Sequence, residues 1–122
     1  MKEAEIERCI FSHDARNLQL RRKLAERSVD LRDECRSVCH FLAPNQKQGK
    51  LLEQELHARG FLEVDITPAG KTGGWCVDAQ IRMSMEQASS HEFTEEMVRS
   101  AAALFCIYDG WRALIPRQDG EY

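Results

Sequence analysis

The stretch that decides the fold is Cys106-Ile107-Tyr108-Asp109-Gly110-Trp111-Arg112-Ala113-Leu114-Ile115, near the end of the chain. Asp-Gly between apolar flanks is typical of a tight hairpin turn. The arm before it directly follows a helical pattern, however, and is too short for a useful strand. We therefore interpret the stretch as one strand from Cys106 to Ile115, in which Gly110 permits a β-bulge or the close approach of a neighbouring backbone.

Upstream of this strand, strand and helix patterns alternate. A short apolar run predicts a strand from Ser37 to Ala43, and Asn45 is well suited to cap the helix that follows. That helix carries an apolar stripe and ends at Gly60, where a left-handed residue is favoured. A second strand is predicted from Phe61 to Ile66. Its alternation points three apolar side chains inward, namely Leu62, Val64 and Ile66.

The clearest strand pattern in the chain follows a loop from Pro68 to Gly74. Its apolar residues alternate with polar ones, and they are Trp75, Val77, Ala79, Ile81 and Met83. Ser89 and Glu92 then match a capping box, which predicts the start of a helix. The apolar positions of that helix are Phe93, Met97, Ala101 and Leu104.

From Ser37 to Ile115 the predicted order is strand, helix, strand, strand, helix, strand. This βαββαβ order is typical of a ferredoxin-like α+β sandwich, a four-stranded antiparallel sheet with two helices on one face. The predicted organisation is an N-terminal helical segment and connector over residues 1–36, a ferredoxin-like core domain over 37–115 and a short tail over 116–122.

The first 27 residues predict an additional helix, because apolar residues recur at helical spacing without Gly or Pro. The recurring residues are Ile6, Ile10, Leu20 and Leu24. Ser12 or Asp14 could cap a second segment, so one long helix and two short ones both remain open. The segment from Ser28 to Arg36 is polar and irregular, which predicts a connector. The helix must pack against either a sheet edge or the open sheet face.

The composition is that of a globular protein without a general attraction to polyanions. Of the 122 residues, 43% are hydrophobic and 30% charged, and the net charge is -3. Binding to nucleic acid or to an anionic membrane would therefore need a local basic patch. No apolar run approaches the length of a membrane span, and the N-terminus lacks an apolar signal core. We expect a cytoplasmic protein.

The five cysteines predict reduced, core-filling thiols, because their number is odd and their spacing irregular. Cys35, Cys39 and His40 invite a zinc interpretation, but no second ligand pair has recognisable spacing. Neighbouring strand residues such as Cys39 and His40 also point to opposite faces. We expect neither a metal nor any other cofactor.

A cysteine nucleophile and a phosphate-binding loop have no stronger support in the sequence than a zinc site. Cys76 or Cys106 could act as a nucleophile beside His40 or His91, but no pattern places a base next to a thiol. The segment from Gly70 to Gly74 lacks the full spacing of a phosphate loop, and it joins two strands rather than a strand and a helix. We therefore expect a hairpin loop there and no catalytic residue in the chain.

Two polar surfaces remain as binding candidates. A basic cluster on the first helix is interpreted as a solvated face, with docking of an acidic partner or RNA as the alternative. It contains Arg16, Arg21, Arg22, Lys23 and Arg27. The open sheet face is expected to present Asp78, Gln80, Arg82, Tyr108 and Arg112, if Trp111 points into the core. The chain lacks the clustered aromatic signature with which such sheets stack single-stranded RNA, so direct nucleic-acid binding is not expected.

Four short motifs occur in order at fitting spacing: Ala43-Pro44-Asn45, Ala58-Arg59-Gly60-Phe61, Gly74-Trp75-Cys76-Val77 and Tyr108-Asp109-Gly110-Trp111. Together they resemble the ribonuclease E inhibitor family, also called regulator of ribonuclease activity B. Further residues fit its N-terminal helix and connector, namely Asn17, Leu20, Leu24 and Asp30-Leu31. Some members of this family carry a long acidic C-terminal tail, which the segment from Pro116 to Tyr122 does not match. An interaction that relies on such a tail is expected to be absent or altered.

The resemblance implies a non-catalytic protein that binds a ribonuclease E-like endoribonuclease and lowers its activity in messenger RNA decay. The five residues expected on the open sheet face are the contact candidates, and the expected mechanism is occlusion or altered assembly of the nuclease. Two alternatives stay open. The first is a small-molecule sensor that binds metabolites between the subunits of a homodimer. The second is a direct RNA-binding module.

Overall fold

A computed structural model describes residues 2–114 of the chain. Its elements are α1 (Glu3–Glu26), β1 (Glu34–Ala43), α2 (Gln46–Ala58), β2 (Glu63–Pro68), the 3₁₀ helix η1 (Gly70–Thr72), β3 (Trp75–Ser84), α3 (Met85–Ala88), α4 (His91–Ala103) and β4 (Ile107–Leu114). The predicted end of the last strand at Ile115 and the predicted tail lie outside the described residues.

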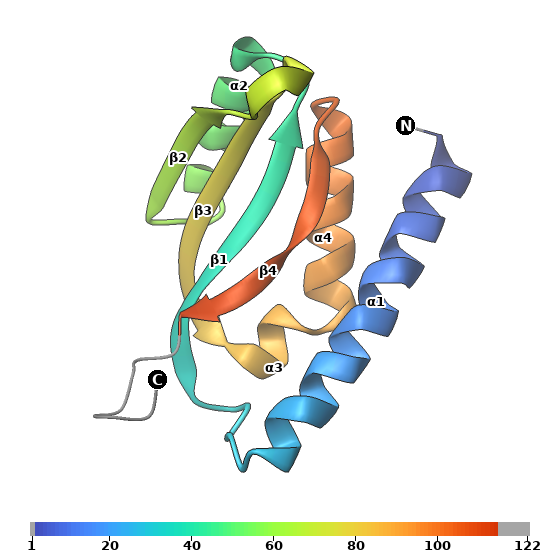
Figure 1. Cartoon of the computed structure of the whole chain (residues 1–122), viewed down its shortest axis with the longest axis vertical. Coiled ribbons are helices and arrows are strands. Elements are labelled where there is room, and N and C mark those ends of the chain that lie inside the picture. Colours follow the sequence, from blue (N-terminus) through green and yellow to red (C-terminus); the bar gives the residue numbers. More distant parts are fainter. Residues whose placement is uncertain (1, 115–122) are drawn as a thin grey trace.

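The strands form one antiparallel sheet in the order β2-β3-β1-β4 (Figure 1). The two longest strands, β1 and β3, lie at the centre, and each of their outer neighbours pairs along most of its length. This order, with α2 and α4 as the crossover helices, is the arrangement of the predicted ferredoxin-like α+β sandwich. The fold prediction is confirmed.

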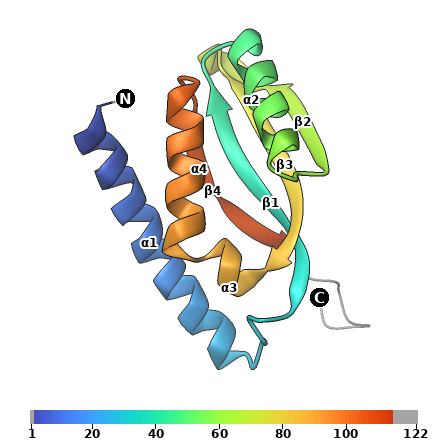
Figure 2. The same cartoon turned by 180° about the vertical axis from the view of Figure 1, so that it is seen from behind.

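All three long helices lie on the same side of the sheet. Figure 2 shows α2 and α4 in front of the strands, with α1 beside α4 and running in the opposite direction. Contacts between α1 and α4 fix this placement. The first helix is one continuous element from Glu3 to Glu26, so the alternative of two short helices is wrong. Because α1 does not lie across the opposite face, that face of the sheet is left uncovered by the described residues.

The helix termini follow local capping chemistry closely. The Asn45 side chain accepts a hydrogen bond from the Gln48 backbone N–H, as predicted. The predicted start of α4 is one residue too early, because Ser90 is the N-cap and accepts from the Phe93 N–H. Ser89 instead donates its hydroxyl to the Met85 carbonyl, 2.7 Å away, in the short helix α3.

Two strand boundaries differ from the sequence prediction. β1 begins at Glu34, three residues before the predicted start at Ser37, because the preceding residues pair with the last residues of β3. β2 begins at Glu63, and the inward orientation predicted for Leu62 is wrong, since its side chain is 59% exposed. Phe61 fills the core instead. Its N–H bonds to the Leu56 carbonyl at the end of α2, which turns the ring inward before the strand starts.

The bulge predicted around Gly110 is present in β4. Phe41 pairs with Tyr108 and His40 with Gly110, so Asp109 has no partner across the strands. Gly110 has φ +109°, a conformation that glycine adopts readily. The extra residue shifts the alternation of side chains by one position. Tyr108 and Trp111 therefore both face the helices, although an unbroken strand would send them to opposite faces.

Candidate functional site

Four rows of side chains cross the strands on the open face of the sheet, beyond the terminal pair of Glu34 and Ser84. Alternation within β1 and β3 sends their odd-numbered residues to the core and their even-numbered residues to this face. From one end of the sheet to the other, the rows are Arg82–Arg36–Leu114, then Glu63–Gln80–Val38–Arg112, then Asp65–Asp78–His40–Gly110, then Thr67–Cys76–Leu42–Ile107.

Three arginines gather at one end of this face, and we call Arg36, Arg82 and Arg112 the basic end. Arg36 lies directly opposite Arg82 on the neighbouring strand, and all three side chains are exposed. None of them forms an ion pair with another described residue. Glu34 stands one row beyond Arg36 without reaching ion-pair distance of these arginines. The basic end therefore carries positive charge that the rest of residues 2–114 does not neutralise by direct contact.

The neighbouring region of the same face is acidic. Asp65 on β2 lies directly opposite Asp78 on β3, which again places like charges across a strand pair. Here the protein supplies a partner, because His40 Nδ1 donates a hydrogen bond of 2.7 Å to Asp78 Oδ1. The open face thus has two charged regions of opposite sign, and the acidic one is partly compensated.

The last row of the open face carries exposed apolar side chains on β1 and β4. Leu42 and Ile107 pair across β1 and β4 and are 39% and 46% exposed. Phe105, just before β4, is 72% exposed and has a left-handed backbone with φ +60°. Exposed apolar side chains next to charged ones are common at protein interfaces.

The structure places four of the five predicted contact residues on the open face: Asp78, Gln80, Arg82 and Arg112. The orientation predicted for Tyr108 is wrong. Its side chain is only 2% exposed and packs against Phe41, because the bulge turns it toward the helices. Sequence reasoning missed Arg36, since the strand was predicted to begin at Ser37. The even-numbered spacing that Arg36 shares with His40 is the signal that could have found it.

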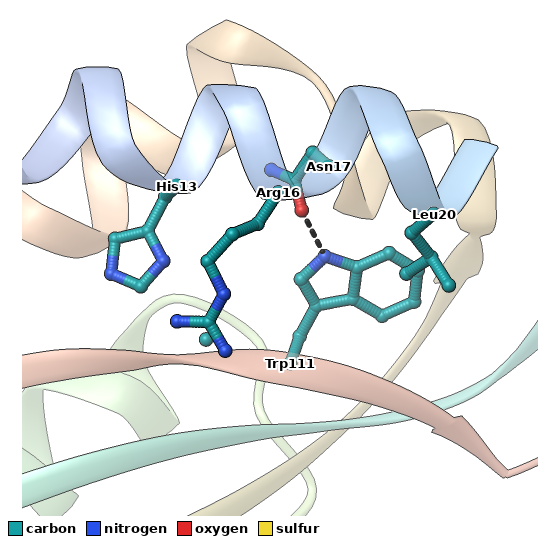
Figure 3. A pocket seen from close by; sticks show the side chains of 6 residues that line it. His13, Arg16, Asn17, Leu20 and Trp111 are labelled. Atoms are coloured by element: carbon teal, nitrogen blue, oxygen red, sulfur yellow. Dashed lines mark hydrogen bonds between the residues drawn. The ribbon is translucent and has the colours of Figure 1, made fainter. Parts of the chain in front are cut away.

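A second, smaller site lies between α1 and β4, and it explains the Tyr108-Asp109-Gly110-Trp111 motif. Figure 3 shows His13, Arg16 and Asn17 directed from α1 toward the strand that carries Trp111. A pocket of about 200 Å³ is lined by His13, Arg16, Asn17, Leu20, Gly110 and Trp111. Trp111 Nε1 donates a hydrogen bond of 2.9 Å to Asn17 Oδ1. Trp111 packs against the core, which is the orientation on which the predicted composition of the open face depended.

His13 and Asn17 are the polar members of an otherwise apolar stripe on α1. They continue the spacing of Ile10 and Leu20, at positions that point toward the sheet. His13 Nε2 donates to the Tyr108 carbonyl at 2.9 Å, and burial lowers the pKa of this imidazole below 6.5. Both side chains find partners among buried groups, so they join α1 to the core rather than form a reactive site.

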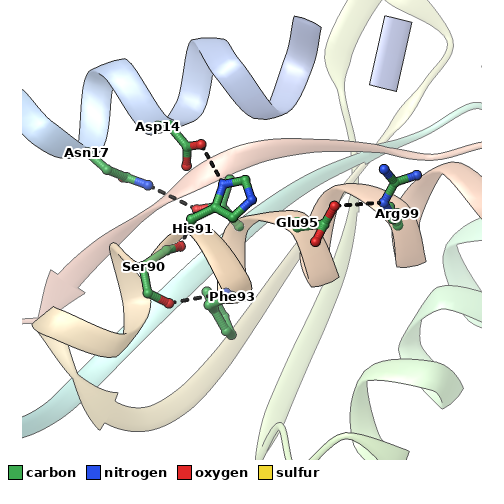
Figure 4. Close-up of polar contacts among 8 residues, drawn as sticks. Asp14, Asn17, Ser90, His91, Phe93, Glu95 and Arg99 are labelled. Carbon is green, nitrogen blue, oxygen red and sulfur yellow. Dashed lines mark hydrogen bonds and ion pairs between the residues drawn. The ribbon is translucent and has the colours of Figure 1, made fainter. Parts of the chain in front are cut away.

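Polar contacts also join α1 to α4, as Figure 4 shows. Asn17 Nδ2 donates to Thr94 Oγ1 at 3.1 Å, and His91 Nδ1 donates to Asp14 Oδ2 at 2.7 Å. The bond to Asp14 raises the pKa of His91 above 6.5. At the other end of α1, Arg99 bonds both carboxylate oxygens of Glu3. The first helix is therefore an integral part of the helical layer.

The predicted basic cluster on α1 faces away from these contacts for the most part. Arg16 lines the pocket beside β4 and Arg21 is half-buried, whereas Arg22, Lys23 and Arg27 are exposed. No ion pair links any of the five to another described residue. Arg16, Lys23 and Arg27 lie seven and four residues apart and so share one side of the helix, whereas Arg21 and Arg22 point to other sides.

The cysteines do not converge on a metal or a base. Within residues 2–114 no group of three His, Cys, Asp or Glu side chains could hold a metal ion. Burial raises the pKa of Cys39 to about 12 and that of Cys106 to about 11, which keeps both thiols protonated and poorly nucleophilic. All five cysteines are free, and these two fill the core. His40 and His91 bond to carboxylates rather than to thiols.

Comparison with protein-family models matches residues 14–112 to the family described as regulator of ribonuclease activity B. The chain belongs to this family. The match runs from the middle of α1 to Arg112, so it includes Asn17, the bulge at Gly110 and three of the four rows of the open face. Comparison with curated proteins finds no match. No helix within the described residues combines the length and apolarity needed to cross a bilayer.

Proposed function

We propose that this regulator of ribonuclease activity acts by docking the open face of its sheet on a ribonuclease E-like endoribonuclease and lowering the rate of RNA cleavage. The family match supports a regulator of ribonuclease activity. One observation carries the choice of surface. Three helices pack on one side of the sheet, whereas the other side presents charged and apolar side chains that no described element covers.

The contact residues in this proposal are Asp78, Gln80, Arg82 and Arg112, with Tyr108 withdrawn because it is buried. They lie in consecutive rows of the open face, together with the exposed apolar side chains of Leu42 and Ile107. Such a mixture supports specific association, since apolar area supplies affinity while complementary charges select the partner and accelerate encounter.

In the proposed mechanism the chain acts by binding alone and catalyses no reaction itself. A docked domain of this size covers nuclease surface and thereby blocks RNA entry or changes how nuclease subunits assemble. Neither effect needs a nucleophile or a general base. This agrees with the protonated state of Cys39 and Cys106 and with the histidines being engaged by carboxylates or backbone carbonyls.

The test is a pull-down of purified ribonuclease E-like enzyme by the tagged chain, combined with an RNA cleavage assay at increasing regulator concentration. We expect binding at micromolar concentration and a matching decrease in cleavage rate. The variant Asp78→Arg/Arg82→Asp should lose at least about tenfold in affinity, because it reverses the charge pattern of the open face without changing net charge.

The matched control is Lys50→Glu/Glu26→Lys, which exchanges two exposed charges on helices and also keeps net charge constant. It should bind like the unmodified chain. Absence of binding at micromolar concentration would refute the proposed function. Equal binding by the open-face variant and the control would place the docking surface elsewhere.

A further inference from the structure

The open face retains an arrangement of arginines that does not serve the stability of the sheet. Arg36 and Arg82 are directly opposed on β1 and β3, and like charges in this position destabilise an antiparallel pair. Arg112 adds a third guanidinium one row away on β4. Arg59 on α2, in contrast, has carboxylate partners in Glu55 and Glu96, although within the described chain the exposed arginines of α1 also lack ion pairs. The three arginines of the basic end have none within ion-pair distance.

A groove adjoins the basic end. It encloses about 300 Å³ and is lined by Glu34, Cys35, Arg36, Arg82 and Leu114. The adjacent Val38 lies between Gln80 and Arg112 in the next row and is buried beneath its neighbours, so the apolar side chain that reaches the groove is Leu114. The groove thus combines two guanidinium groups with apolar surface from Leu114 and Cys35 and a single carboxylate, that of Glu34. Because the two arginines outnumber Glu34, the groove suits a chain segment that carries both carboxylates and an apolar side chain.

We propose that the basic end receives an acidic peptide segment of the protein partner, with guanidinium groups of Arg36, Arg82 and Arg112 on its carboxylates and an apolar side chain in the adjoining groove. This inference rests on the proposed function and names the chemistry of the partner at that site. Guanidinium groups bind carboxylates through paired hydrogen bonds, which gives both affinity and orientation.

An acidic peptide fits the open face better than RNA does. Single-stranded RNA is bound on such sheets by stacking bases on aromatic rings, and no Phe, Tyr or Trp side chain lies in the described rows of this face. A phosphate backbone that followed the strands beyond the basic end would also meet Asp65 and Asp78. A short acidic segment can end before it reaches them.

The test uses a fluorescein-labelled short peptide of Glu, Asp and Leu, and fluorescence anisotropy with the full chain. We expect saturable binding that weakens as salt is added. The variant Arg36→Glu/Arg82→Glu should bind at least about tenfold more weakly. The control Lys47→Glu/Lys50→Glu makes the same change of net charge on exposed positions of α2, and it should bind like the unmodified chain.

A second peptide, with Lys in place of Glu and Asp, distinguishes lost recognition from lost folding. The doubly reversed variant should gain affinity for this peptide, whereas an unfolded chain would not. Urea unfolding checks the fold directly, and because the reversal replaces one like-charge pair by another, the midpoint should remain close to that of the unmodified chain.

The remaining outcomes separate this inference from the proposed function. If the nuclease bound the unmodified chain and the Arg36→Glu/Arg82→Glu variant with equal affinity, the acidic-segment proposal would be overturned. The proposed docking on the nuclease would not be affected by that result. Failure of the unmodified chain to bind the nuclease would overturn the proposed function. Tighter binding of an oligouridine strand than of the acidic peptide, lost in the same variant, would identify the basic end as an RNA site and refute the peptide assignment.

Discussion

At the scale of single residues, Gly110 shows how one backbone conformation can determine which face of the sheet the side chains of a strand occupy. Its φ of +109° is strained for any residue with a side chain, although a Cβ atom there would clash with no neighbour. A Cβ atom there would lie 3.8 Å from His13, which is ordinary contact distance. The requirement for glycine is therefore conformational rather than steric. It follows from the bulge that turns Tyr108 and Trp111 to the same face.

We expect Gly110→Ala to lower the free energy of unfolding by about 1–3 kcal/mol, since the new residue must hold a sparsely populated backbone conformation. The matched comparison is Gly49→Ala in α2. A Cβ atom at Gly49 would meet Ile66 at 3.5 Å, also an ordinary contact, and the backbone there is helical. That variant should gain about 0.5–1 kcal/mol from helix propensity. Urea unfolding measures both. Equal effects in the two variants would contradict the conformational explanation.

At the scale of elements, α1 is held by polar contacts placed within its apolar stripe. Asn17 bridges two elements, because its side chain accepts from Trp111 on β4 and donates to Thr94 on α4. Both contacts are short, and the Asn17 side chain is buried. A buried amide with both ends satisfied fixes the register of a helix more strictly than apolar packing alone.

The variant Asn17→Ala should therefore lower the free energy of unfolding by about 1–3 kcal/mol, because it leaves the half-buried indole N–H of Trp111 without an acceptor. Leu18→Ala is the control on the exposed face of the same helix, and it should change stability by less than about 0.5 kcal/mol. A double-mutant cycle with Trp111→Phe isolates the hydrogen bond. A coupling energy near zero in that cycle would show that the bond does not hold the helix.

Much of the element order could be predicted from the sequence, because strand alternation and helix caps are local signals. The βαββαβ core, the cap at Asn45 and the bulge all follow from neighbouring residues. The face that Tyr108 occupies could not be assigned in the same way, since it depends on where the bulge resets the alternation. Arg36 was missed for a related reason. Its strand is extended by pairing with β3, which no local pattern reveals.

At the scale of the whole molecule, two histidines make opposite contributions to stability as pH changes. Burial lowers the pKa of His13, while Asp14 raises the pKa of His91, which is exposed. The groups facing His13 are the Tyr108 carbonyl, Arg16, Asp14 and Asp109. Below pH 6.5 the unfolded chain binds a proton at His13 that the folded chain resists. Folding is therefore weakened at this site as the pH falls.

His91 acts in the reverse sense, because the folded chain binds its proton more tightly than the unfolded chain does. Its contribution to stability is present below pH 6.5 and is lost as the pH rises through its folded pKa.

We therefore expect the stability of His13→Gln to fall less than that of the unmodified chain when the pH is lowered from about 7.5 to about 5.5. The stability of His91→Gln should fall more than that of the unmodified chain over the same range. Urea midpoints at the two pH values measure both differences, and comparison with the unmodified chain cancels the groups that the variants share. If both variants shifted the pH dependence in the same direction, the assignment of opposite pKa shifts to His13 and His91 would be refuted.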